Sequence, residues 1–591
     1  MTPERAFRRP IIRIVGLVAL GAILSCVAWW PMFDAYPNTP EGDGRYFLHL
    51  FNVVKASVNR YHELPLWNPY ECGGAPLWDN PESMAASPFL WLTMALSGTK
   101  TVYAWNVAHL TIGFVGMWLL CRREVQLSRM ATFAAACIYT FGVANASQYA
   151  GAHAALISFL DAPLALFLWR GAETDTRKAV GLGLLVALMF MDGATYPIPH
   201  TALLLAADTL TRIGTRERAK RILRAGSIAL PVALGVGAAR VIPLFDQFTS
   251  KHRLIEADVD HLARWNSLWK MYMWREVHWW NRLPGQTYVW GEYDAYMGGI
   301  VMFCALVGLL LAGRKRVWLI ALAAFTFVLM LGHFAPWAPW SFLHEHVFPF
   351  KSMRVSARFR LLFCMFIAAF VGVAMDRAPV LLGRVFGSSK NVARIARALV
   401  CGFAFLGAGD MMGVAGDLVA SRFGGLPEHP IPTTPRLYYE GGGVAEYIDQ
   451  PRQNRGRIAC QDAWAFSSGA AVWGGDVPQA RAKDKNAVVE VANRTQNTFT
   501  IDVVAEHPAR ILVNSGYERG WRTDVGEIGQ ENLLLVVDVP EGRHHIKLEY
   551  VPKGLYLGLA ITVLSLLASI AFLARLGPFK DRAAGLVSRR D

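Results

Sequence analysis

The chain has 591 residues, of which 53% are hydrophobic and 20 are Trp, and this composition excludes a single soluble domain. Its 59 basic and 45 acidic side chains give a net charge of +14, a balance that can indicate nucleic-acid binding. No RNA- or DNA-binding motif accompanies the charge, so the sequence argues against a nucleic-acid partner. It predicts a polytopic α-helical membrane protein.

Apolar runs recur along the chain, many of them long enough to cross a hydrocarbon core of about 30 Å. The first run is too long for the apolar region of a signal peptide, and no small-residue cleavage site follows it, so we expect a retained helix. Several other runs are short or end in Pro and Gly. The sequence predicts about twelve transmembrane helices, near residues 12–33, 101–120, 130–149, 152–169, 179–192, 198–212, 225–245, 296–313, 316–333, 357–375, 396–413 and 555–574.

Basic residues cluster in alternate short loops between these runs. If the runs are helices, all the clusters fall on one side of the membrane, and the positive-inside rule makes that side cytoplasmic. An even number of helices then places both termini in the cytoplasm. The clusters are Arg5, Arg8 and Arg9; Arg122 and Arg123; Arg170, Arg177 and Lys178; Arg216, Arg218, Lys220, Arg221 and Arg224; Arg314, Lys315 and Arg316; Arg394 and Arg397; Arg575, Lys580 and Arg582.

The opposite side receives the longer segments, around 34–100, 246–293, 334–356 and 414–552. The last of these contains stretches with the period of strands that bury one face. These stretches are AVVEVANR, NTFTIDVVA, ARILVNS, LLLVVDV and HHIKLEYV. We expect residues 455–552 to form a β-sandwich-like domain outside the membrane, tethered by the final helix.

Two cysteines, Cys72 and Cys460, fall in the predicted outer segments, whereas most of the others lie in apolar runs. The oxidising side of a bacterial membrane permits a disulfide between them. Two unpaired thiols are the favoured alternative.

The loop over residues 43–89 is rich in Trp, Pro, Gly and acidic residues and follows the first run closely. Such a loop, joined to a membrane helix, is not typical of a spacer. It predicts one wall of an active site at the outer membrane surface, with Asp43 as its best-placed carboxylate. Trp67 and Asn68, in the stretch LPLWNPY, are candidates for substrate binding.

The stretch EGDGRYFLHLF followed by LPLWNPYECGGAPLWDNPESMAASPF resembles the first outer loop of the YfhO family of bacterial membrane proteins. VIPLFDQFTSKHR, GEYDAYMGGI, RVSARFRLL and the C-terminal ILVNSGYERGWRTDVG with VPEGRHHIKLEYVPKGLYLG match the family in the same order. The chain departs from it at Arg519 and Ser356, where a Pro is usual. The resemblance implies a GT-C glycosyltransferase, an enzyme that takes sugar from a polyprenyl-phosphate carrier.

The chemistry of such a transfer indicates which residues to seek. Phosphate leaves an anomeric carbon as a stable anion, so no general acid is needed, unlike glycoside hydrolysis with its two carboxylates. One base must take the proton of the acceptor hydroxyl, and cations must stabilise the departing phosphate. One carboxylate and outer-face arginines suffice.

Asp43 is the candidate base, because the resemblance places the essential carboxylate of these enzymes in the first outer loop. The alternative is a helix N-cap, since Asp43 directly precedes a predicted helix over residues 44–59. Asp34 is the second candidate for catalysis, with a solvated loop acid as its alternative.

Arg354 and Arg358 are candidates for the donor phosphate. A spacing of four puts both guanidiniums on one face of a helix, and guanidinium suits phosphate oxygens. The alternative is a pair of arginines that reach toward lipid headgroups. Arg253 is a weaker candidate. His200, in YPIPH, is expected either to face the phosphate or to be a structural histidine.

Glu292, Tyr293 and Tyr296 lie where a loop re-enters the membrane and are candidates for sugar or acceptor binding, together with Trp67 and Asn68. An acid at a helix start is the alternative for Glu292. No zinc-type Cys/His cluster occurs in the sequence, and no cofactor is predicted with certainty. A divalent cation held by Asp43 and Glu292 stays open, but no D-x-D pair supports it.

The sequence thus predicts a GT-C-like transmembrane domain over 1–413, a mostly β extracytoplasmic domain over 414–552, and a final helix with a cytoplasmic tail over 553–591. We expect an inverting glycosyltransferase of the bacterial inner membrane. Its partners would be a polyprenyl-phosphate sugar, membrane lipids and an outer-face lipid, polymer or glycan acceptor. A lipid or sugar transporter would show repeat symmetry and ionisable residues at the midplane, and only Asp161 fits. A non-catalytic envelope scaffold is the other alternative.

Overall fold

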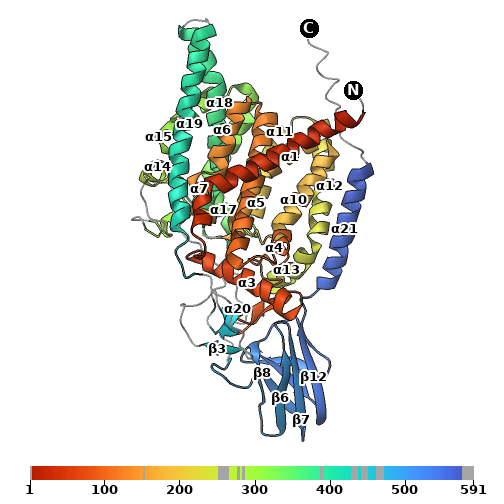
Figure 1. The fold of residues 1–591 in the computed structure, drawn as a ribbon. Helices are drawn as coiled ribbons and strands as arrows, with labels where there is room; N and C mark the ends of the chain where they lie inside the picture. Colours follow the sequence, from red (N-terminus) through yellow and green to blue (C-terminus); the bar gives the residue numbers. More distant parts are fainter. Residues whose placement is uncertain are drawn as a thin grey trace.

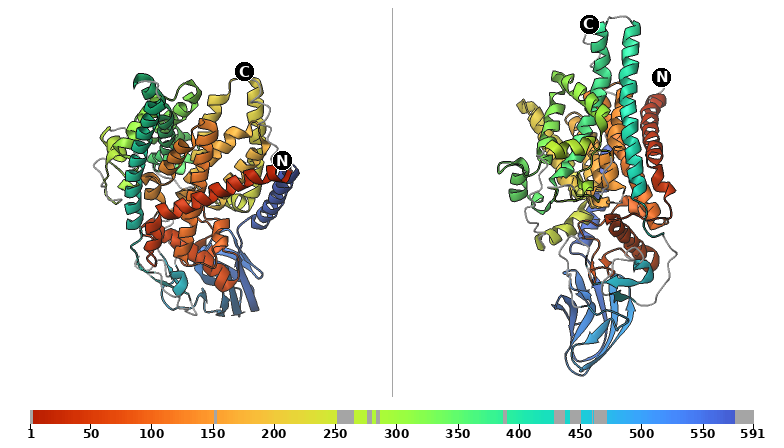
Figure 2. Two further views of the ribbon diagram at one scale, coloured as in Figure 1. Left: turned by 45° about the horizontal axis from the view of Figure 1, so that its top comes forward. Right: turned by 90° about the vertical axis from the view of Figure 1, so that its left-hand side faces the viewer.

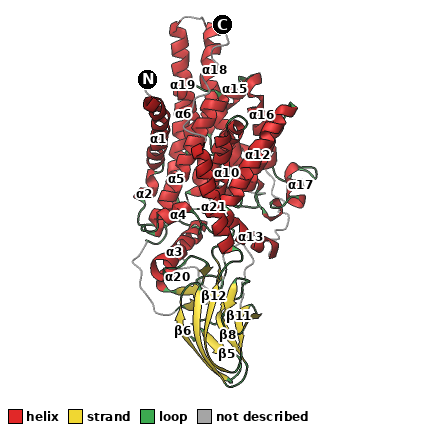
Figure 3. Cartoon of the chain, turned by 90° about the vertical axis from the view of Figure 1, so that its right-hand side faces the viewer, coloured by secondary structure: helices red, strands yellow, loops and turns green. Residues whose placement is uncertain are grey.

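The computed structural model describes residues 3–150, 153–250, 265–275, 280–282, 286–386, 390–427, 437–440, 450–458, 460 and 472–575. Helices fill one end of the molecule and most of the strands fill the other (Figure 3). The first helix begins, and the last helix ends, on the side of the helical bundle away from the strands (Figure 1).

Helices form at all twelve predicted apolar runs. Six helical segments in the described part of the chain are long and apolar enough to cross a membrane, or seven if a bent pair counts as one span. The helices at the twelve predicted runs are α1 (Pro3–Ala28), α5 (Gly98–Leu119), α6 (Arg129–Thr140), α7 (Val143–Tyr149), α8 (Ala154–Ile157), α9 (Ala162–Ala172), α10 (Thr176–Met191), α11 (Pro197–Arg212), α12 (Arg216–Val236), α13 (Ala238–Ser250), α15 (Gly298–Leu310), α16 (Val317–Met330), α18 (Arg360–Phe386), α19 (Lys390–Ser421) and α21 (Leu555–Arg575).

The predicted run over 225–245 is not one straight helix, because the chain turns by 82° between α12 and α13. The predicted count of about twelve spans also exceeds what helix length supports. α10 and α15, for example, have 16 and 13 residues, fewer than the about 20 that a full crossing needs.

The outermost helices carry apolar side chains on their exposed surface. Ile23 of α1 is 62% exposed and Leu564 of α21 is 66% exposed, as expected for helices that face lipid tails. α18 is buried along much of its length. Together with α19 it extends beyond the other helices, on the side away from the strands (Figure 2).

The segment predicted as the first outer loop begins with α3 (Asp43–Tyr61), which lies across the end of the bundle above the strands (Figure 1). Twelve of its nineteen residues are buried. Such burial shows that α3 is covered on more than one side, so it joins the helical and β parts of the molecule.

Two four-stranded antiparallel sheets form the strand end, with strand orders β10-β11-β8-β5 and β6-β7-β12-β9. Alternate residues of β7, such as Phe499 and Ile501, are buried, as the sequence period predicts. All five predicted strand stretches are confirmed. The bounds are β5 (Ala480–Ala482), β6 (Ala487–Arg494), β7 (Thr498–Ala505), β8 (Ala509–Gly516), β9 (Trp521–Thr523), β10 (Glu527–Glu531), β11 (Leu534–Val539) and β12 (Gly542–Tyr550).

The predicted domain boundary at residue 413 falls inside α19, which continues to Ser421. Apolar residues such as Val414 and Leu418 keep the helix packed against the bundle beyond that point.

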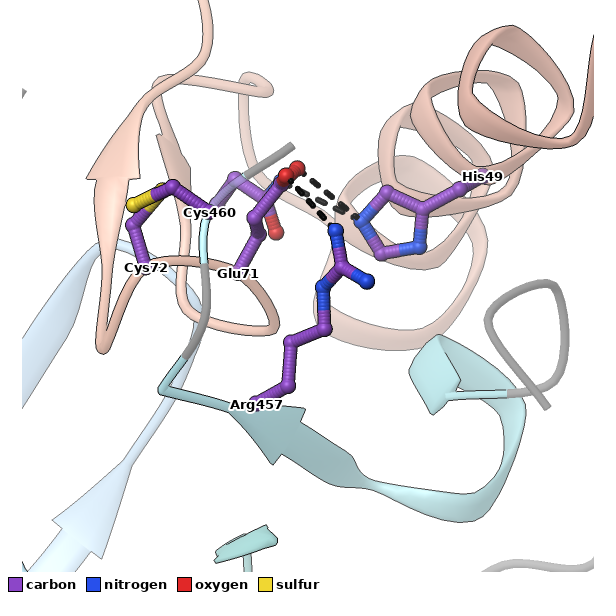
Figure 4. The surroundings of a disulfide bond; sticks show 6 residues. His49, Glu71, Cys72, Arg457 and Cys460 are labelled. Atoms are coloured by element: carbon purple, nitrogen blue, oxygen red, sulfur yellow. Dashed lines mark hydrogen bonds and ion pairs between the residues drawn. A yellow bond between two sulfur atoms is a disulfide. The ribbon is translucent and has the colours of Figure 1, made fainter. Parts of the chain in front are cut away.

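Cys72 and Cys460 form a disulfide, so the favoured alternative of two unpaired thiols is wrong. The bond joins the first outer loop to the chain just after β4 (Arg455–Arg457). Beside it, the buried Glu71 forms an ion pair with the Arg457 guanidinium at 3.2 Å and lies 4.0 Å from His49 of α3 (Figure 4). The disulfide and this ion pair fix the loop to the segment that precedes the sheets.

Replacing both cysteines with serine is expected to lower stability by about 2–5 kcal/mol, the typical effect of losing a native disulfide. The bond closes a loop with a sequence separation of 388 residues, so its loss frees a large part of the unfolded chain. Thermal unfolding of the purified protein, followed by Trp fluorescence, measures the change. Reductant should lower the midpoint of the wild type but leave the double variant unchanged. An equal effect of reductant on both proteins would contradict the prediction.

A second junction ties the first outer loop to the last strand and to α13. The buried carboxylate of Asp79 accepts hydrogen bonds from the Tyr550 hydroxyl, at 3.1 Å, and from the Gln247 amide, at 2.8 Å. Burial raises the pKa of Asp79 to about 6, although both hydrogen bonds oppose the rise. Asp79 therefore binds its proton more tightly in the folded protein than in the unfolded chain.

The raised pKa gives this junction a pH dependence with a definite sign. The folded protein binds the Asp79 proton more tightly than the unfolded chain, so stability falls as pH rises from about 4 to about 6. Asp79→Asn mimics the neutral carboxyl group and should remove this part of the slope. Unfolding midpoints of both proteins across this range measure the difference. Parallel pH profiles would contradict the assignment.

Candidate active site

Asp43 lies in the first turn of α3, and its position is fixed by the end of α19. The backbone at Pro40 pairs with Phe423, and the Glu41 amide donates to the Arg422 carbonyl at 2.9 Å. Gly42, with φ of +62°, is the N-cap of α3 and makes the turn into the helix. Asp43 itself is exposed.

The alternative reading of Asp43 as a helix N-cap is therefore wrong, since Gly42 occupies that position and no side chain caps the helix. A carboxylate in the first helical turn is favoured by the helix dipole. Asp34 ends the short helix α2 (Trp30–Asp34) and is also exposed.

His153, between α7 and α8, lies within electrostatic reach of Asp43, Glu292, Arg358 and Arg422. Its ring packs 5.1 Å from the ring of Phe47 in α3. Burial lowers the pKa of His153 to about 4, against the opposing effect of Asp43. The imidazole is therefore neutral near pH 7. Its neighbours come both from α3 and from the helical bundle.

Arg422 and Trp280 complete the surroundings of Asp43. The Arg422 guanidinium lies 5.6 Å from the centre of the Trp280 ring, and its charge acts on Asp43. A Cβ atom at Gly42 would come within 2.8 Å of the same ring. The backbone at Gly42 thus admits the indole beside Asp43.

Glu292 ends a short 3-10 helix, Trp290–Glu292, and forms an ion pair with Arg358 through both of its oxygens. The Arg358 Nε donates at 3.0 Å. Burial alone would raise the pKa of Glu292, but Arg358 and Arg360 outweigh it and lower the pKa to about 2. Glu292 is therefore a permanent anion that holds a permanent cation.

The backbone around Glu292 is fixed from two sides. Arg360 donates to the carbonyls of Gly291 at 2.8 Å and Asp294 at 3.0 Å. The Ser147 hydroxyl, at 2.9 Å, and the Gln148 amide, at 2.7 Å, donate to the Gly291 carbonyl from α7. These bonds place the Glu292–Arg358 pair precisely relative to the bundle.

The predicted helical pairing of Arg354 with Arg358 is wrong. Arg354 precedes the 3-10 helix Ser356–Phe359, so the two side chains do not share a face of a regular α-helix. Arg354 is exposed, and its guanidinium lies 5.9 Å from the Tyr288 ring centre. Arg358 is buried over the ring of Tyr196, at 4.3 Å.

His200 is fully buried and lies behind Tyr196. Its Nδ1 is 2.8 Å from the Tyr196 carbonyl, and its ring packs 4.2 Å from the ring of Phe359. This environment fits the structural alternative and leaves phosphate no direct access. Arg253 lies outside the described residues.

The remaining candidates are placed by packing. Trp67, in β1 (Trp67–Asn68), is fully buried against Trp521 and Tyr550 of the sheets. Asn68 is buried as well, with its amide nitrogen 3.3 Å from the Nε2 atom of His49. Both join the loop to the β region and present no open surface to a sugar.

Tyr293 and Tyr296 are also buried. The Tyr296 hydroxyl donates to Asp410 of α19 at 2.7 Å, and the Tyr293 hydroxyl accepts from the Tyr288 amide at 3.4 Å. These contacts support the turn that carries Glu292.

A cavity of about 200 Å³ adjoins the Arg358 side chain through Tyr196. Its wall is mostly apolar. The lining residues are Pro81, Glu82, Phe190, Gly193, Ala194, Thr195, Tyr196, Ile198, Pro199, Leu244, Phe248, Phe348, Pro349, Ser352 and Met353. The cavity therefore suits an apolar chain, and the polar side chains of its wall are Glu82, Thr195, Tyr196 and Ser352.

The hypothesis of a cation between Asp43 and Glu292 gains no support from the geometry. Among the described residues, no group of three or more His, Cys, Asp or Glu side chains is arranged to hold a metal ion. Both Glu292 oxygens already accept from Arg358, so a cation would have to displace a buried guanidinium.

Sequence reasoning missed His153, Arg422 and Glu82. His153 stands alone in AGAHAAL, and Arg422 follows a helix whose end was placed too early. Glu82 is one of several acids in the first outer loop. Only the fold brings these residues toward Asp43 or Arg358.

No family model matches the chain, and no curated protein does. Among solved structures, the chain resembles the arabinofuranosyltransferase AftD from Mycobacteria, with 13% identity, a TM-score of 0.45, and coverage of 90% of this chain and 40% of that one. It also resembles ArnT from Cupriavidus metallidurans, in the apo state with 12% identity, a TM-score of 0.45, and coverage of 76% of this chain and 87% of that one. For ArnT bound to undecaprenyl phosphate, the identity is 13%, the TM-score 0.42, and the coverage 74% and 84%.

This chain spans only 40% of the length of the mycobacterial protein. The similarity to both proteins is one of partial overall shape and assigns no role to any residue. Membership of the YfhO family stays a prediction.

Proposed function

We propose that the protein is an inverting GT-C-type glycosyltransferase that moves a monosaccharide from a polyprenyl-phosphate carrier to an outer-face acceptor. One observation carries the proposal. The exposed carboxylate of Asp43 lies within electrostatic reach of the neutral His153 and of the buried Arg422. His153 in turn lies within reach of the Glu292–Arg358 pair, which adjoins an apolar cavity through Tyr196. The YfhO-like motifs in the same loops also favour it.

In this proposal Asp43 is the general base. It removes the proton of the acceptor hydroxyl as the oxygen attacks the anomeric carbon from the face opposite the phosphate. The bond between the anomeric carbon and the phosphate oxygen breaks, and its electron pair leaves with the phosphate. A positioned base of this kind contributes about 10²–10⁴ to the rate. Because His153 is neutral near pH 7, Arg422 is the cation that acts on the Asp43 carboxylate.

Among the described residues, Arg354 is the best-placed cation for the leaving phosphate, because its side chain is exposed and it follows the cavity-lining Met353. Arg358 acts through Glu292 and Tyr196, which it holds in place. The cavity would receive the first part of the polyprenyl chain. Its mostly apolar wall suits isoprene units, and Tyr196 links it to Arg358.

The proposal also sets the orientation of the molecule. The outer loops, the active site and the β sheets would lie on the extracytoplasmic side of the bacterial inner membrane. The basic loops and both termini would lie in the cytoplasm. The acceptor would be a lipid, a polymer or a glycan at the outer face.

The test uses the purified full-length protein in detergent with a panel of polyprenyl-phosphate monosaccharides. Release of polyprenyl phosphate is measured, with a crude envelope extract as the source of acceptor. Turnover with at least one donor is expected. Absence of release from every donor, together with uptake of intact labelled donor by proteoliposomes, would overturn the proposal in favour of a transporter. Absence of both activities would favour a scaffold.

A further inference from the structure

The wall of the cavity near Tyr196 includes a short segment of the first outer loop, residues 80–87, which is held by the bundle. The fully buried Arg240 of α13 donates to the carbonyls of Asn80 and Ser83, the latter at 2.7 Å. Gly193 lies against the same segment with φ of +69°, and a Cβ atom there would come within 2.8 Å of the Ser83 carbonyl. This close approach fixes the distance between the loop and the end of α10.

A chain of buried polar groups continues from this segment into the bundle. The Ser87 hydroxyl donates to Asp192 at 2.5 Å. His109 of α5 lies 3.5 Å from Asp192 through Nε2 and 3.3 Å from Asp161 through Nδ1. All four side chains are fully buried. Carboxylates only accept hydrogen bonds, so an imidazole between two of them is satisfied only when both nitrogens donate.

Burying these ionisable side chains is unfavourable, because desolvation of each ion costs several kcal/mol. Apolar residues of similar volume would often serve packing as well. This series of polar contacts ends at Ser87, five residues from Glu82. Its most direct effect is therefore to place the loop segment that carries Glu82.

Glu82 is the acidic residue that this segment brings to the cavity wall. It lines the cavity together with Tyr196, and its carboxylate acts electrostatically on Arg358, whose guanidinium lies 4.3 Å over the Tyr196 ring. The rest of the wall is mostly apolar. A carboxylate in the wall of such a cavity can accept hydrogen bonds from a polyhydroxyl group.

We infer that Glu82 contacts the transferred sugar of the donor by accepting hydrogen bonds from its hydroxyl groups, and that the Ser87–Asp192–His109–Asp161 chain positions Glu82. The inference rests on the proposed function. It assigns Glu82 to donor binding, while the proton transfer stays with Asp43.

The first experiment compares donor kinetics of the wild type, Glu82→Gln and Glu82→Asp. Glu82→Gln should raise the KM for donor about tenfold, as expected for loss of one hydrogen bond to a charged group. Glu82→Asp should recover part of the loss. The matched control is Glu490→Gln, an exposed carboxylate of β6, which should leave the KM unchanged. Equal KM values for wild type and Glu82→Gln would overturn the inference.

The second experiment tests the positioning chain with Ser87→Ala, Asp192→Asn and the double variant. Each single change should raise the KM by about threefold, and the double change should raise it no further, because both act through one chain. A purely structural role would lower the unfolding midpoint and leave the KM unchanged, which would overturn the positioning part. Ser87→Ala removes only a hydroxyl group. If Asp192→Asn fails to fold, the KM of Ser87→Ala alone decides the test.

The two proposals fail in different ways. Wild-type protein that releases no polyprenyl phosphate contradicts the proposed function, and this inference falls with it. Wild-type turnover with an unchanged KM in Glu82→Gln contradicts the inference alone.

Discussion

Asp43→Asn is expected to reduce turnover by about a thousandfold, within the range of 10²–10⁴ that a positioned base contributes. The substitution keeps the size of the side chain and removes its ability to take a proton. Asp43 is exposed in the first turn of α3, and no side-chain cap depends on it. The fold should therefore survive. Steady-state release of polyprenyl phosphate, with the unfolding midpoint as a check, measures the effect.

Asp34→Asn is the matched control. Asp34 is an exposed acid of the same outer segment, at the end of α2, and its replacement should leave turnover within about twofold of the wild type. Equal turnover of wild type and Asp43→Asn would contradict the assignment and make Asp34 the next candidate for the base.

Glu292→Gln is expected to destabilise the protein by about 3–5 kcal/mol, because it leaves the buried Arg358 guanidinium without its counter-charge. The side chains of Arg358 and Glu292 are 4% and 14% exposed, so water screens little of this loss. The Glu292 pKa lies far below its ordinary value, so the stabilisation is present above about pH 4.5 and is lost as pH falls toward 2. Thermal and denaturant unfolding measure the change.

The double variant Glu292→Leu/Arg358→Met should recover most of that stability, since it removes both charges. It should not recover activity. The exposed pair Lys547–Glu549, at 3.7 Å, is the control, and Glu549→Gln should change stability by less than about 1 kcal/mol. If Glu292→Gln had an effect as small as that of Glu549→Gln, the pair would not be the buried anchor described above.

The sequence period predicted strands such as β7 well because alternate residues of that strand are buried. The alternation in NTFTIDVVA appears in the structure as the buried Phe499, Ile501 and Val503. Apolar runs predicted helices because their length matches a hydrocarbon core, where only a helix satisfies the backbone of a single segment. They did not predict the 82° turn between α12 and α13, which falls at Gly237, the C-cap residue of α12.

The site was predicted less completely, because spacing along the chain does not give three-dimensional neighbours. A spacing of four suggested one helical face for Arg354 and Arg358, but the helix begins later than the pattern implied. Trp67 is an aromatic residue of a polar loop, which suggested sugar binding, yet it is fully buried against the sheets. The disulfide likewise joins segments 388 residues apart.

The most direct test of the proposed function uses a polyprenyl-phosphate sugar labelled with tritium in the sugar and with radioactive phosphorus in the phosphate. Proteoliposomes that contain the wild-type protein are incubated with this donor and an envelope acceptor, and the two labels are then separated. We predict that sugar leaves the carrier in equal amount to the polyprenyl phosphate formed, and that Asp43→Asn abolishes the separation. If the two labels stay joined while the donor crosses the membrane, the protein is not a glycosyltransferase.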